Sequence, residues 1–434
     1  MRRPRGSRGL DRPLTGQVSV PGDKSITHRA LILAALARGR SLVARPNTGD
    51  DVAATAAMLR GLGAGCSLDL DKGQAQVEGS GIEGLREPSS VLDAGNSGTS
   101  LRLLAGVCAG LGGLSVLTGD DSLRRRPMLR VVAPLRQMGA RVDGRDHGNL
   151  APLVVRGGGL TGIDVDLPVA SAQVKSALLL AGLAAQGTTE VREPGPSRDH
   201  TERMLRSLEV PIELGEGSVA VQGGHQLPSF RAVIPGDISS AMFLIVAASI
   251  VPGSDLTITG VGLNPTRTAA LQVLRSMGAD LRETIEGEEL GEPVGSVRVR
   301  HSELRGVEVP QAMVPALIDE IPALAVAATQ AEGATVFSGV GELRVKESDR
   351  IEAIASGLRA IGGRVEVFDD GFTVQGPVAL DGGAVDSQGD HRIAMAFAVA
   401  GLMARSKVRV ERWSCVDTSF PEFLDVMGEA TRKK

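Results

Sequence analysis

One pattern occurs six times along the chain, and this repetition constrains the fold more than any single motif. Each copy begins with a short polar cluster and continues as an Ala- and Leu-rich apolar run. It then stops at Gly or another small residue and ends in an alternating, strand-like strip. Successive copies begin 66 to 82 residues apart. The copies occupy residues 24–39, 96–112, 171–187, 237–253, 319–333 and 390–405. Internal repetition of this kind indicates a fold assembled from similar supersecondary units.

Each copy predicts more than one helix. A second, amphipathic helix is expected after the strip, at residues 52–62, 127–138, 200–208, 268–277 and 348–361. Two strands follow in most copies, for example 364–367 and 372–374 around the turn Asp369-Asp370-Gly371. The repeat unit is therefore βαβαββ. The first helices are apolar nearly all round, as at residues 241–251, which predicts burial on every side. The sequence thus predicts an α/β protein with two similar domains, each containing three repeats around buried parallel helices.

The two ends of the chain indicate how the domains are connected. A strand at residues 14–20 precedes the first copy, whereas the sixth copy ends after residues 417–429 without a closing hairpin. We therefore expect the N-terminal strand to join the C-terminal half, so that the chain crosses between domains twice. Two Pro-Gly-Asp tripeptides, at 21–23 and 235–237, mark the expected crossings, as a hinge or as ordinary loops. The predicted domains are residues 22–235, and residues 1–21 together with 236–434.

Composition excludes several functional classes. A net charge of −4, no Tyr and a single Trp argue against a nucleic-acid-binding surface. The three cysteines, Cys66, Cys108 and Cys415, have neither metal-ligand spacing nor an even count, which predicts a reduced, cytoplasmic setting. The basic residues 1–5 are not followed by an apolar segment, so we expect a disordered tail rather than a signal peptide. The longest apolar run, residues 241–251, is too short to span a membrane.

The polar clusters point to anion binding, because a helix N-terminus presents unpaired N–H groups and partial positive charge. Gly22-Asp23-Lys24-Ser25 lacks the spacing of a phosphate-binding P-loop, but a Lys at a buried helix start favours contact with an anion. Residues 96–100 and 171–175 place small polar groups at two further starts, where ordinary capping is the alternative. Of Arg124, Arg125 and Arg126, only one is expected to point inward. His200, taken alone, is expected to be structural.

The second half supplies acidic groups together with further cations. Asp319-Glu320 stands directly before an apolar helix, where Asp319 could be a cap or a base. Residues 346–350 (Lys-Glu-Ser-Asp-Arg) and 390–392 (Asp-His-Arg) supply arginines that can bind carboxylates through two parallel hydrogen bonds. A cluster of cations with only two acids would suit a pair of anionic substrates. Its expected members are Lys24, Arg126, Arg350, Arg392, Asp319 and Glu347.

Seven strings together resemble the 5-enolpyruvylshikimate-3-phosphate synthase family, and the resemblance covers residues 14–427. They lie at residues 21–25, 95–99, 125–128, 171–175, 264–267, 343–351 and 390–395. The resemblance implies an enolpyruvyl-transferase-like, inside-out α/β barrel in each domain, with a double-crossover hinge. It also implies a transferase of the shikimate pathway, which leads to chorismate and the aromatic amino acids. Such an enzyme moves the enolpyruvyl group of phosphoenolpyruvate to the 5-hydroxyl of shikimate 3-phosphate and releases phosphate through a tetrahedral addition–elimination intermediate. The resemblance implies no metal or organic cofactor. We also expect a cytoplasmic monomer, because each domain can bury its own helices, and we expect it to bind neither nucleic acid nor membrane.

The resemblance also implies roles for individual residues. Residues 22–235 would mainly seat shikimate 3-phosphate, and the second domain would carry the base and the closing arginines. Asp319 would be the base for the 5-hydroxyl and Glu347 would move protons at the methylene carbon, while Lys24 would touch both substrates and the bridging oxygen. The implied ligands of shikimate 3-phosphate are Lys24, Ser25, Arg29, Ser171, Ala172, Gln173, Arg198, Asp319 and Lys346. Those of phosphoenolpyruvate are Lys24, Asn96, Gly98, Arg126, Gln173, Arg350 and Arg392.

The motifs resemble the second class of these synthases, some of which tolerate the inhibitor glyphosate. Gly98 stands where the most tolerant pattern has Ala, so sensitivity to the inhibitor stays open. Ser419 occupies the place of a phosphoenolpyruvate-contacting Lys of the other class. Two alternatives also remain. A UDP-N-acetylglucosamine enolpyruvyl transferase usually carries a Cys in the loop that residues 118–127 form here without one. A non-catalytic phosphosugar-binding module would not be expected to retain both Asp319 and Glu347.

Overall fold

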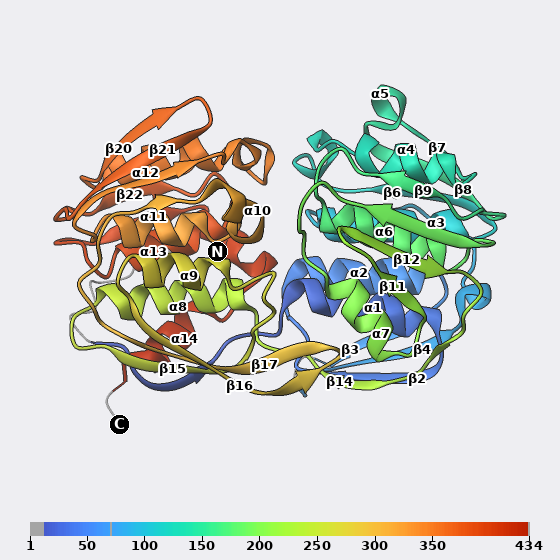
Figure 1. Cartoon of the computed structure of the whole chain (residues 1–434), viewed down its shortest axis with the longest axis horizontal. Coiled ribbons are helices and arrows are strands. Elements are labelled where there is room, and N and C mark those ends of the chain that lie inside the picture. Colours follow the sequence, from blue (N-terminus) through green and yellow to red (C-terminus); the bar gives the residue numbers. More distant parts are fainter. Residues whose placement is uncertain (1–12, 70–71, 433–434) are drawn as a thin grey trace. The chain divides into compact units, whose positions relative to one another are not determined.

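The computed structural model describes residues 13–69 and 72–432, so the basic stretch at residues 1–5 lies outside it. The chain forms two compact units (Figure 1). The N unit comprises Gly22–Pro235 together with Glu288–Glu292, and the C unit comprises the residues up to Pro21, Gly236–Gly287 and those from Pro293 onward. Each unit has its own hydrophobic core.

The core of the N unit is built from three inner helices, one from each of the first three copies of the repeat. They are α1 (Lys24–Leu36), α3 (Gly98–Gly110) and α6 (Ala172–Gly182). Their Ala- and Leu-rich sequences are buried on nearly all sides because α1 and α6 both pack against α3. Three further helices carry a more polar face: α2 (Asp50–Gly61), α4 (Leu129–Gln137) and α7 (His200–Ser207). A four-residue helix, α5 (Arg145–Gly148), completes the unit.

Three sheets belong to this unit. The first has the order β13-β2-β4-β3 with β14 also beside β2: β2 (Ala37–Ala44), β3 (Gly65–Asp69), β4 (Gln74–Ser80), β13 (Leu227–Pro228), β14 (Arg231–Val233). The second has the order β5-β6-β8-β7: β5 (Leu92–Asp93), β6 (Gly113–Thr118), β7 (Arg141–Gly144), β8 (Leu150–Gly157). The third has the order β11-β12-β10-β9: β9 (Asp164–Asp166), β10 (Thr188–Arg192), β11 (Ile212–Leu214), β12 (Ser218–Gln222). Each sheet contains parallel pairing at one edge, and its other strand pairs are antiparallel.

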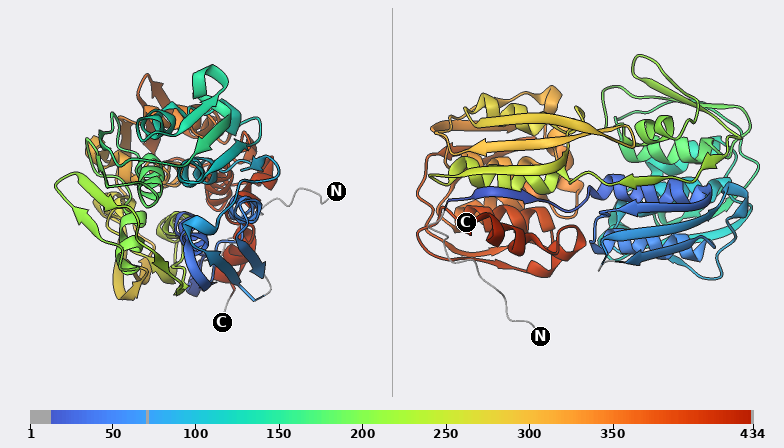
Figure 2. Two further views of the ribbon diagram at one scale, coloured as in Figure 1. Left: turned by 90° about the vertical axis from the view of Figure 1, so that its right-hand side faces the viewer. Right: turned by 90° about the horizontal axis from the view of Figure 1, so that it is seen from below.

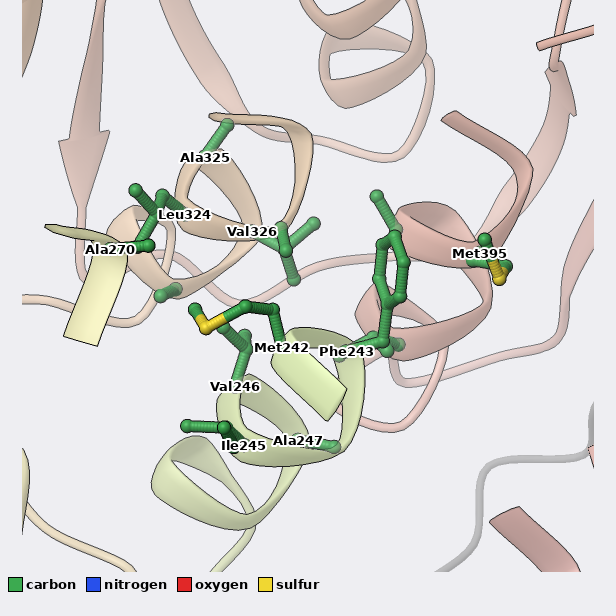
Figure 3. Packing of buried hydrophobic residues seen from close by; sticks show 14 of the residues in the cluster. Met242, Phe243, Ile245, Val246, Ala247, Ala270, Leu324, Ala325, Val326 and Met395 are labelled. Carbon is green, nitrogen blue, oxygen red and sulfur yellow. The ribbon is translucent and has the colours of Figure 1, made fainter. Parts of the chain in front are cut away.

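The C unit repeats this plan. Its inner helices are α8 (Ile238–Ile250), α11 (Ile321–Ala328) and α13 (His391–Ala400), and α8 is buried at every position. Figure 3 shows Met242 and Phe243 of α8 beside Val326 of α11, with Met395 of α13 beyond the Phe243 ring. The remaining helices are α9 (Ala269–Ser276), α10 (Val314–Leu317), α12 (Arg350–Ala360) and α14 (Phe423–Ala430).

The C unit also has three sheets. The first has the order β1-β15-β17-β16: β1 (Thr15–Ser19), β15 (Asp255–Gly262), β16 (Asp280–Glu289), β17 (Glu292–Arg300). The second has the order β18-β19-β21-β20: β18 (Glu308–Val309), β19 (Gly333–Ser338), β20 (Arg364–Phe368), β21 (Gly371–Gly376). The third is the pair β22 (Gly383–Asp386) and β23 (Val408–Glu411). The repeated βαβαββ units and the short sixth copy are therefore confirmed.

The strand that opens the chain confirms the expected pairing. β1 runs parallel to β15, from Thr15 opposite Asp255 to Ser19 opposite Thr259, and Figure 2 shows the two side by side. The N unit contains the matching arrangement, because β14 runs parallel to β2. In both units the strand before a Pro-Gly-Asp tripeptide therefore pairs with a strand of its own unit, while the helix after the tripeptide belongs to the other unit.

Apart from the short segment Glu288–Glu292, which lies with the N unit inside the predicted second domain, the division into units falls at Pro21/Gly22 and Pro235/Gly236. In the N unit the amide of Asp23 donates to the carbonyl of Pro235 at 2.7 Å, and in the C unit the amide of Asp237 donates to the carbonyl of Pro21 at 2.8 Å. Glycine is required at position 22, since a Cβ there would lie 2.0 Å from the carbonyl oxygen of Arg45. The two crossovers are therefore tied to each other by reciprocal backbone hydrogen bonds.

The last helix of the described residues follows a 3-10 turn and a proline. The turn occupies Trp413–Thr418, and α14 starts at Phe423. Pro421 lies between them and disfavours helix for the residue before it, which explains why the turn does not continue directly into the helix. Within residues 13–69 and 72–432 no single helix is long and apolar enough to cross a membrane. One sharply bent pair, Gln311–Leu317 with Ile321–Ala328, passes that test by length and composition only.

Candidate active site

The predicted polar clusters lie at the starts of the inner helices. Five of the six helices, within the described part of the chain, receive a side-chain cap: Asp23 for α1, Ser97 for α3, Ser171 for α6, Asp237 for α8 and Asp390 for α13. Each capping oxygen accepts a hydrogen bond from a backbone N–H two or three residues further on, as expected for N-caps. The reactive side chains predicted next to these caps therefore belong to the first turn of a helix or to the residue that precedes the helix.

At the start of α1, Lys24 is half-buried and pairs with Asp51, with 2.6 Å between Nζ and Oδ2. Asp51 is the second residue of α2 and was not among the predicted site residues. Ser25 follows, and its carbonyl accepts a hydrogen bond from Arg29 at 3.0 Å. The structure thus places Lys24, Ser25 and Arg29 within the first two turns of α1, with Asp51 as a counter-ion of the lysine.

Arg29 is buried, and its remaining bonds join α1 to two other helices. Its Nε donates to Thr201 Oγ1 of α7 at 2.8 Å, and its Nη2 donates to Ser176 Oγ of α6 at 2.8 Å. Burial lowers the pKa of Arg29 to about 10, and the charge of Arg198 nearby acts in the same direction. The carboxylates of Glu202 and Asp23 act in the opposite direction and partly offset this, so Arg29 is a buried cation with acidic groups already near it.

The start of α3 meets Arg126, the one arginine of its basic turn that points inward, as expected: Arg125 is exposed and Arg124 half-buried. Arg126 Nη2 donates to Asn96 Oδ1 at 2.9 Å. Gly98 lies under the same group, because a Cβ at this position would be 3.4 Å from Arg126 Nη1 and 2.8 Å from Arg102 Nη1.

Arg102 links α3 to α6. Its Nη1 donates to Gln173 Oε1 at 2.7 Å, and Gln173 Nε2 donates to Thr99 Oγ1 at 2.9 Å. The amide of Gln173 is thereby held in one orientation beside Ser171 and Ala172, at the exposed end of α6. Arg102 was not among the predicted residues, although an arginine four positions after Gly98 in an apolar helix was an available signal.

In the C unit, Arg350 is the centre of the candidate site. Its side chain is 1% exposed, and it contacts three carboxylates. Nε bonds Asp390 Oδ2 at 2.7 Å, Nη1 bonds Asp319 Oδ1 at 3.1 Å, and Nη2 bonds Glu347 Oε2 at 2.5 Å. These carboxylates raise the pKa of the Arg350 guanidinium despite its burial. Asp319 and Glu347, the two predicted proton-transfer groups, therefore both accept hydrogen bonds from the same guanidinium.

Asp319 has two further cations near it. Lys346 Nζ lies 3.9 Å from its Oδ1, and Arg392 Nη2 lies 4.0 Å from its Oδ2. Arg392 also donates to the backbone carbonyl of Asp319 at 3.1 Å. All five residues predicted in this half are thus brought together: Asp319, Lys346, Glu347, Arg350 and Arg392.

Asp319 is not the cap of α11, because the cap position is held by Glu320. Glu320 is buried and accepts a hydrogen bond from Ser239 Oγ. Arg267, the last residue of the string at 264–267, donates to the same hydroxyl at 2.7 Å. Glu320 Oε1 also lies 3.8 Å from Arg392 Nη1, so Glu320 and Asp319 share this cation.

The chemistry of the two groups is complementary. The N unit offers Lys24 and several arginines, together with hydroxyls and amides at three helix starts, which suits a phosphorylated, polyhydroxylated ligand. The C unit offers two carboxylates among cations, which suits proton transfer on an anionic substrate. No group of three or more His, Cys, Asp or Glu residues with metal-ligand geometry occurs in the part of the chain that the structure describes. Fold and site together are typical of an α/β enzyme with two three-repeat units that acts on anionic small molecules.

Comparison with known proteins specifies this class further. The family described as EPSP synthase (3-phosphoshikimate 1-carboxyvinyltransferase) matches residues 10–427. The chain is 52% identical to the 3-phosphoshikimate 1-carboxyvinyltransferase of Synechococcus sp. over 419 residues, 96% of this chain and 94% of the relative. It is 53% identical to that of Pelotomaculum thermopropionicum over 422 residues, 97% of each chain. The chain therefore belongs to the EPSP synthase family.

Solved structures agree with this assignment. The structure of EPSP synthase from Acinetobacter baumannii matches with a TM-score of 0.87 and 41% identity, covering 99% of this chain and 97% of that one. The enolpyruvyl transferase NikO from Streptomyces tendae matches with a TM-score of 0.80 at 20% identity, which shows a shared fold only. The predicted enolpyruvyl-transferase-like fold is thus confirmed.

Proposed function

We propose that the chain transfers the enolpyruvyl group of phosphoenolpyruvate to the 5-hydroxyl of shikimate 3-phosphate and releases phosphate. The observation that carries this proposal is membership of the EPSP synthase family over almost the whole chain, at about half identity to several carboxyvinyltransferases. A UDP-sugar enolpyruvyl transferase is not favoured, because the relatives share the 3-phosphoshikimate name. The clustering of Asp319 and Glu347 on Arg350 favours a catalytic protein over a binding module.

We assign the N unit to shikimate 3-phosphate. Ser171, the backbone of Ala172, Gln173 and Arg198 would bind the 3-phosphate, because three of them lie at the N-terminus of α6, where N–H groups favour anions. Ser25 and Arg29 would hold the ring and its carboxylate. Arg29 already uses three of its five N–H donors within the protein, so two remain for a ligand.

We assign the enolpyruvyl chemistry to both units. Lys24, Asn96, Gly98, Arg126 and Gln173 would border phosphoenolpyruvate in the N unit, and Arg350 and Arg392 would bind its phosphate and carboxylate in the C unit. Each nitrogen of Arg350 already bonds one carboxylate. Nη1 and Nη2 each have a second N–H, so two of the five donors of Arg350 remain for phosphoenolpyruvate.

The proton steps follow from the two carboxyl groups. Addition needs a base at the 5-hydroxyl and a proton donor at the methylene carbon, and elimination of phosphate needs the proton at that carbon to be removed again. Asp319 would take the hydroxyl proton, Glu347 would serve the carbon, and Lys346 would lie near the shikimate ring. Because both sets of groups must act on the same substrates, we propose that the crossovers at Pro21–Gly22 and Pro235–Gly236 form a hinge. We also propose that the enzyme works as a cytoplasmic monomer without a cofactor.

A direct assay tests the activity. Purified protein is mixed with phosphoenolpyruvate and shikimate 3-phosphate, phosphate release is followed continuously, and the product is identified by mass. UDP-N-acetylglucosamine replaces shikimate 3-phosphate in the control. Phosphate release is expected only with shikimate 3-phosphate; release with the UDP-sugar instead, or with neither acceptor, overturns the proposal.

A further inference from the structure

Lys175 lies in the same helix as the proposed phosphate ligands but points to a different group of residues. Its side chain is 7% exposed, and its Nζ bonds Glu193 Oε2 at 2.6 Å and Glu202 Oε1 at 2.8 Å. Burial disfavours its charge, but the two glutamates more than offset this and raise the pKa of Lys175. A lysine that is nearly enclosed and shared by two carboxylates has a defined position.

The two glutamates lie at opposite ends of one loop. Glu193 directly follows β10, which ends at Arg192, and Glu202 lies in the first turn of α7, which starts at His200. The loop between them carries Arg198. Lys175, from the first turn of α6, therefore fixes both ends of this loop against the helix that carries Ser171, Ala172 and Gln173.

Glu193 adds a second connection between these segments. Its Oε1 accepts a hydrogen bond from the backbone N–H of Ser171 at 2.8 Å, and its Oε2 accepts one from Ser197 Oγ at 2.7 Å. One carboxylate thus holds the residue that caps α6 and the residue that precedes Arg198. Bonds to a charged acceptor are among the stronger hydrogen bonds in proteins, so this arrangement is well suited to preorganisation.

We infer that Lys175 and Glu193 are positioning residues that preorganise the 3-phosphate site by holding the Arg198 loop and the start of α6 at a fixed separation. This inference rests on the proposed function. We call Lys175 and Glu193 the clamp. When the clamp is removed, the site should lose affinity, because the ligand itself must then order the loop that carries Arg198. The effect should be larger for the phosphorylated acceptor, because Ser171, Ala172, Gln173 and Arg198 are all assigned to its phosphate, whereas only Gln173 of these is also assigned to phosphoenolpyruvate.

The variants Lys175→Met and Glu193→Gln test the inference by steady-state kinetics with each substrate varied in turn. A cavity of about 370 Å³ borders Lys175, Glu193 and Glu202, so water can solvate groups that a substitution leaves without their partner. The double variant Lys175→Met/Glu193→Gln removes one charge of each sign and is used if Lys175→Met does not fold. Lys175→Arg is the conservative variant. Glu190→Gln is the matched control, because Glu190 lies on β10 and contacts Arg192 at the surface.

We expect the KM for shikimate 3-phosphate to rise about tenfold in each clamp variant, with the KM for phosphoenolpyruvate and kcat changed less than about threefold. Lys175→Arg recovers most of the loss, and Glu190→Gln matches the parent. Equal rises in both KM values, or an unchanged KM for shikimate 3-phosphate in folded clamp variants, overturn the inference. If the parent protein itself shows no turnover with shikimate 3-phosphate, the proposed function fails; if the parent is active and the variants match it, only the clamp fails.

Discussion

Replacing Arg350 by Met should destabilise the C unit strongly. The methionine retains an apolar stem of similar length, but it removes the only guanidinium that contacts Asp319, Glu347 and Asp390 together among the described residues. Three carboxylates would then lie close to one another without that cation. The effect should therefore exceed that of losing an ordinary surface ion pair.

The size of the effect depends on how buried each carboxylate is. Asp390 is fully buried, and breaking one partner of a buried ion pair costs about 3–5 kcal/mol. Asp390 keeps two hydrogen bonds, from the backbone N–H of Arg392 at 2.9 Å and from Ser348 Oγ at 3.4 Å. The cost of removing its counter-ion should therefore lie at the lower end of this range. Asp319 and Glu347 are 16% and 23% exposed, so water can solvate them and their share is small. We expect a loss of about 3 kcal/mol in the free energy of unfolding.

Urea unfolding followed by tryptophan fluorescence measures this loss. Trp413 is the single Trp of the chain and belongs to the C unit, where its ring lies 5.9 Å from that of Phe423. With a slope of about 2 kcal/mol per molar urea, the midpoint should fall by about 1.5 M. Arg409→Met is the control, since its pair with Glu411 is exposed and should contribute less than about 1 kcal/mol.

The double variant Arg350→Met/Asp390→Asn distinguishes loss of a cation from loss of packing. Removing the charge of Asp390 as well should restore part of the stability, because no fully buried carboxylate is then left without its counter-ion. The reasoning is refuted if Arg350→Met unfolds within 1 kcal/mol of the parent, or if the double variant is no more stable than the single one.

Three further outcomes are expected. Asp319→Asn should lower kcat at least about a hundredfold while the Kd for shikimate 3-phosphate, measured by calorimetry, changes little; normal turnover contradicts its role as base. Gly98→Ala should raise the KM for phosphoenolpyruvate more than that for shikimate 3-phosphate, because the new Cβ lies 2.8 Å from Arg102 Nη1 and 3.4 Å from Arg126 Nη1; equal KM values in parent and variant argue against this. Burial lowers the pKa of His28 well below its ordinary value of 6.5, so the unfolded chain binds a proton below that pH that the folded chain does not. Stability should therefore fall as the pH drops below about 6.5, and His28→Asn should weaken this dependence in urea titrations at pH 7.5 and 5.5; an unchanged pH dependence contradicts it.

The fold was largely predictable because its determinants are local. Ala- and Leu-rich segments without a polar face can only be inner helices, and five of the six caps are Asp or Ser in the expected cluster. The place of the N-terminal strand also followed, since an unpaired strand must find an edge. The matching pairing of β14 with β2 could not be predicted, because β14 has only three residues, too few to show an alternation of polar and apolar residues.

The contacts of the site residues were less predictable, because they join segments far apart in the chain. Asp51 has the appearance of an ordinary acid in the first turn of a helix, and nothing local identifies it as the partner of Lys24. Arg350 bonds residues 31 and 40 positions away as well as its neighbour Glu347. Such distant partners depend on how helices from separate copies meet, and a single sequence does not contain that information.

Asp319 illustrates how a repeated scaffold can hold a site that is not repeated. At the corresponding helix starts, Asp23, Asp237 and Asp390 each use a carboxylate oxygen to accept a backbone N–H. A carboxylate committed to a cap is poorly suited to take a proton, because protonation would weaken the cap and destabilise the helix. In α11 the cap position is shifted to Glu320, so Asp319 lies one residue before it and is held by Arg350 instead. Because Asp319 lies outside the cap position of α11, its carboxylate is not needed to cap the helix and is available for its proposed role as a base.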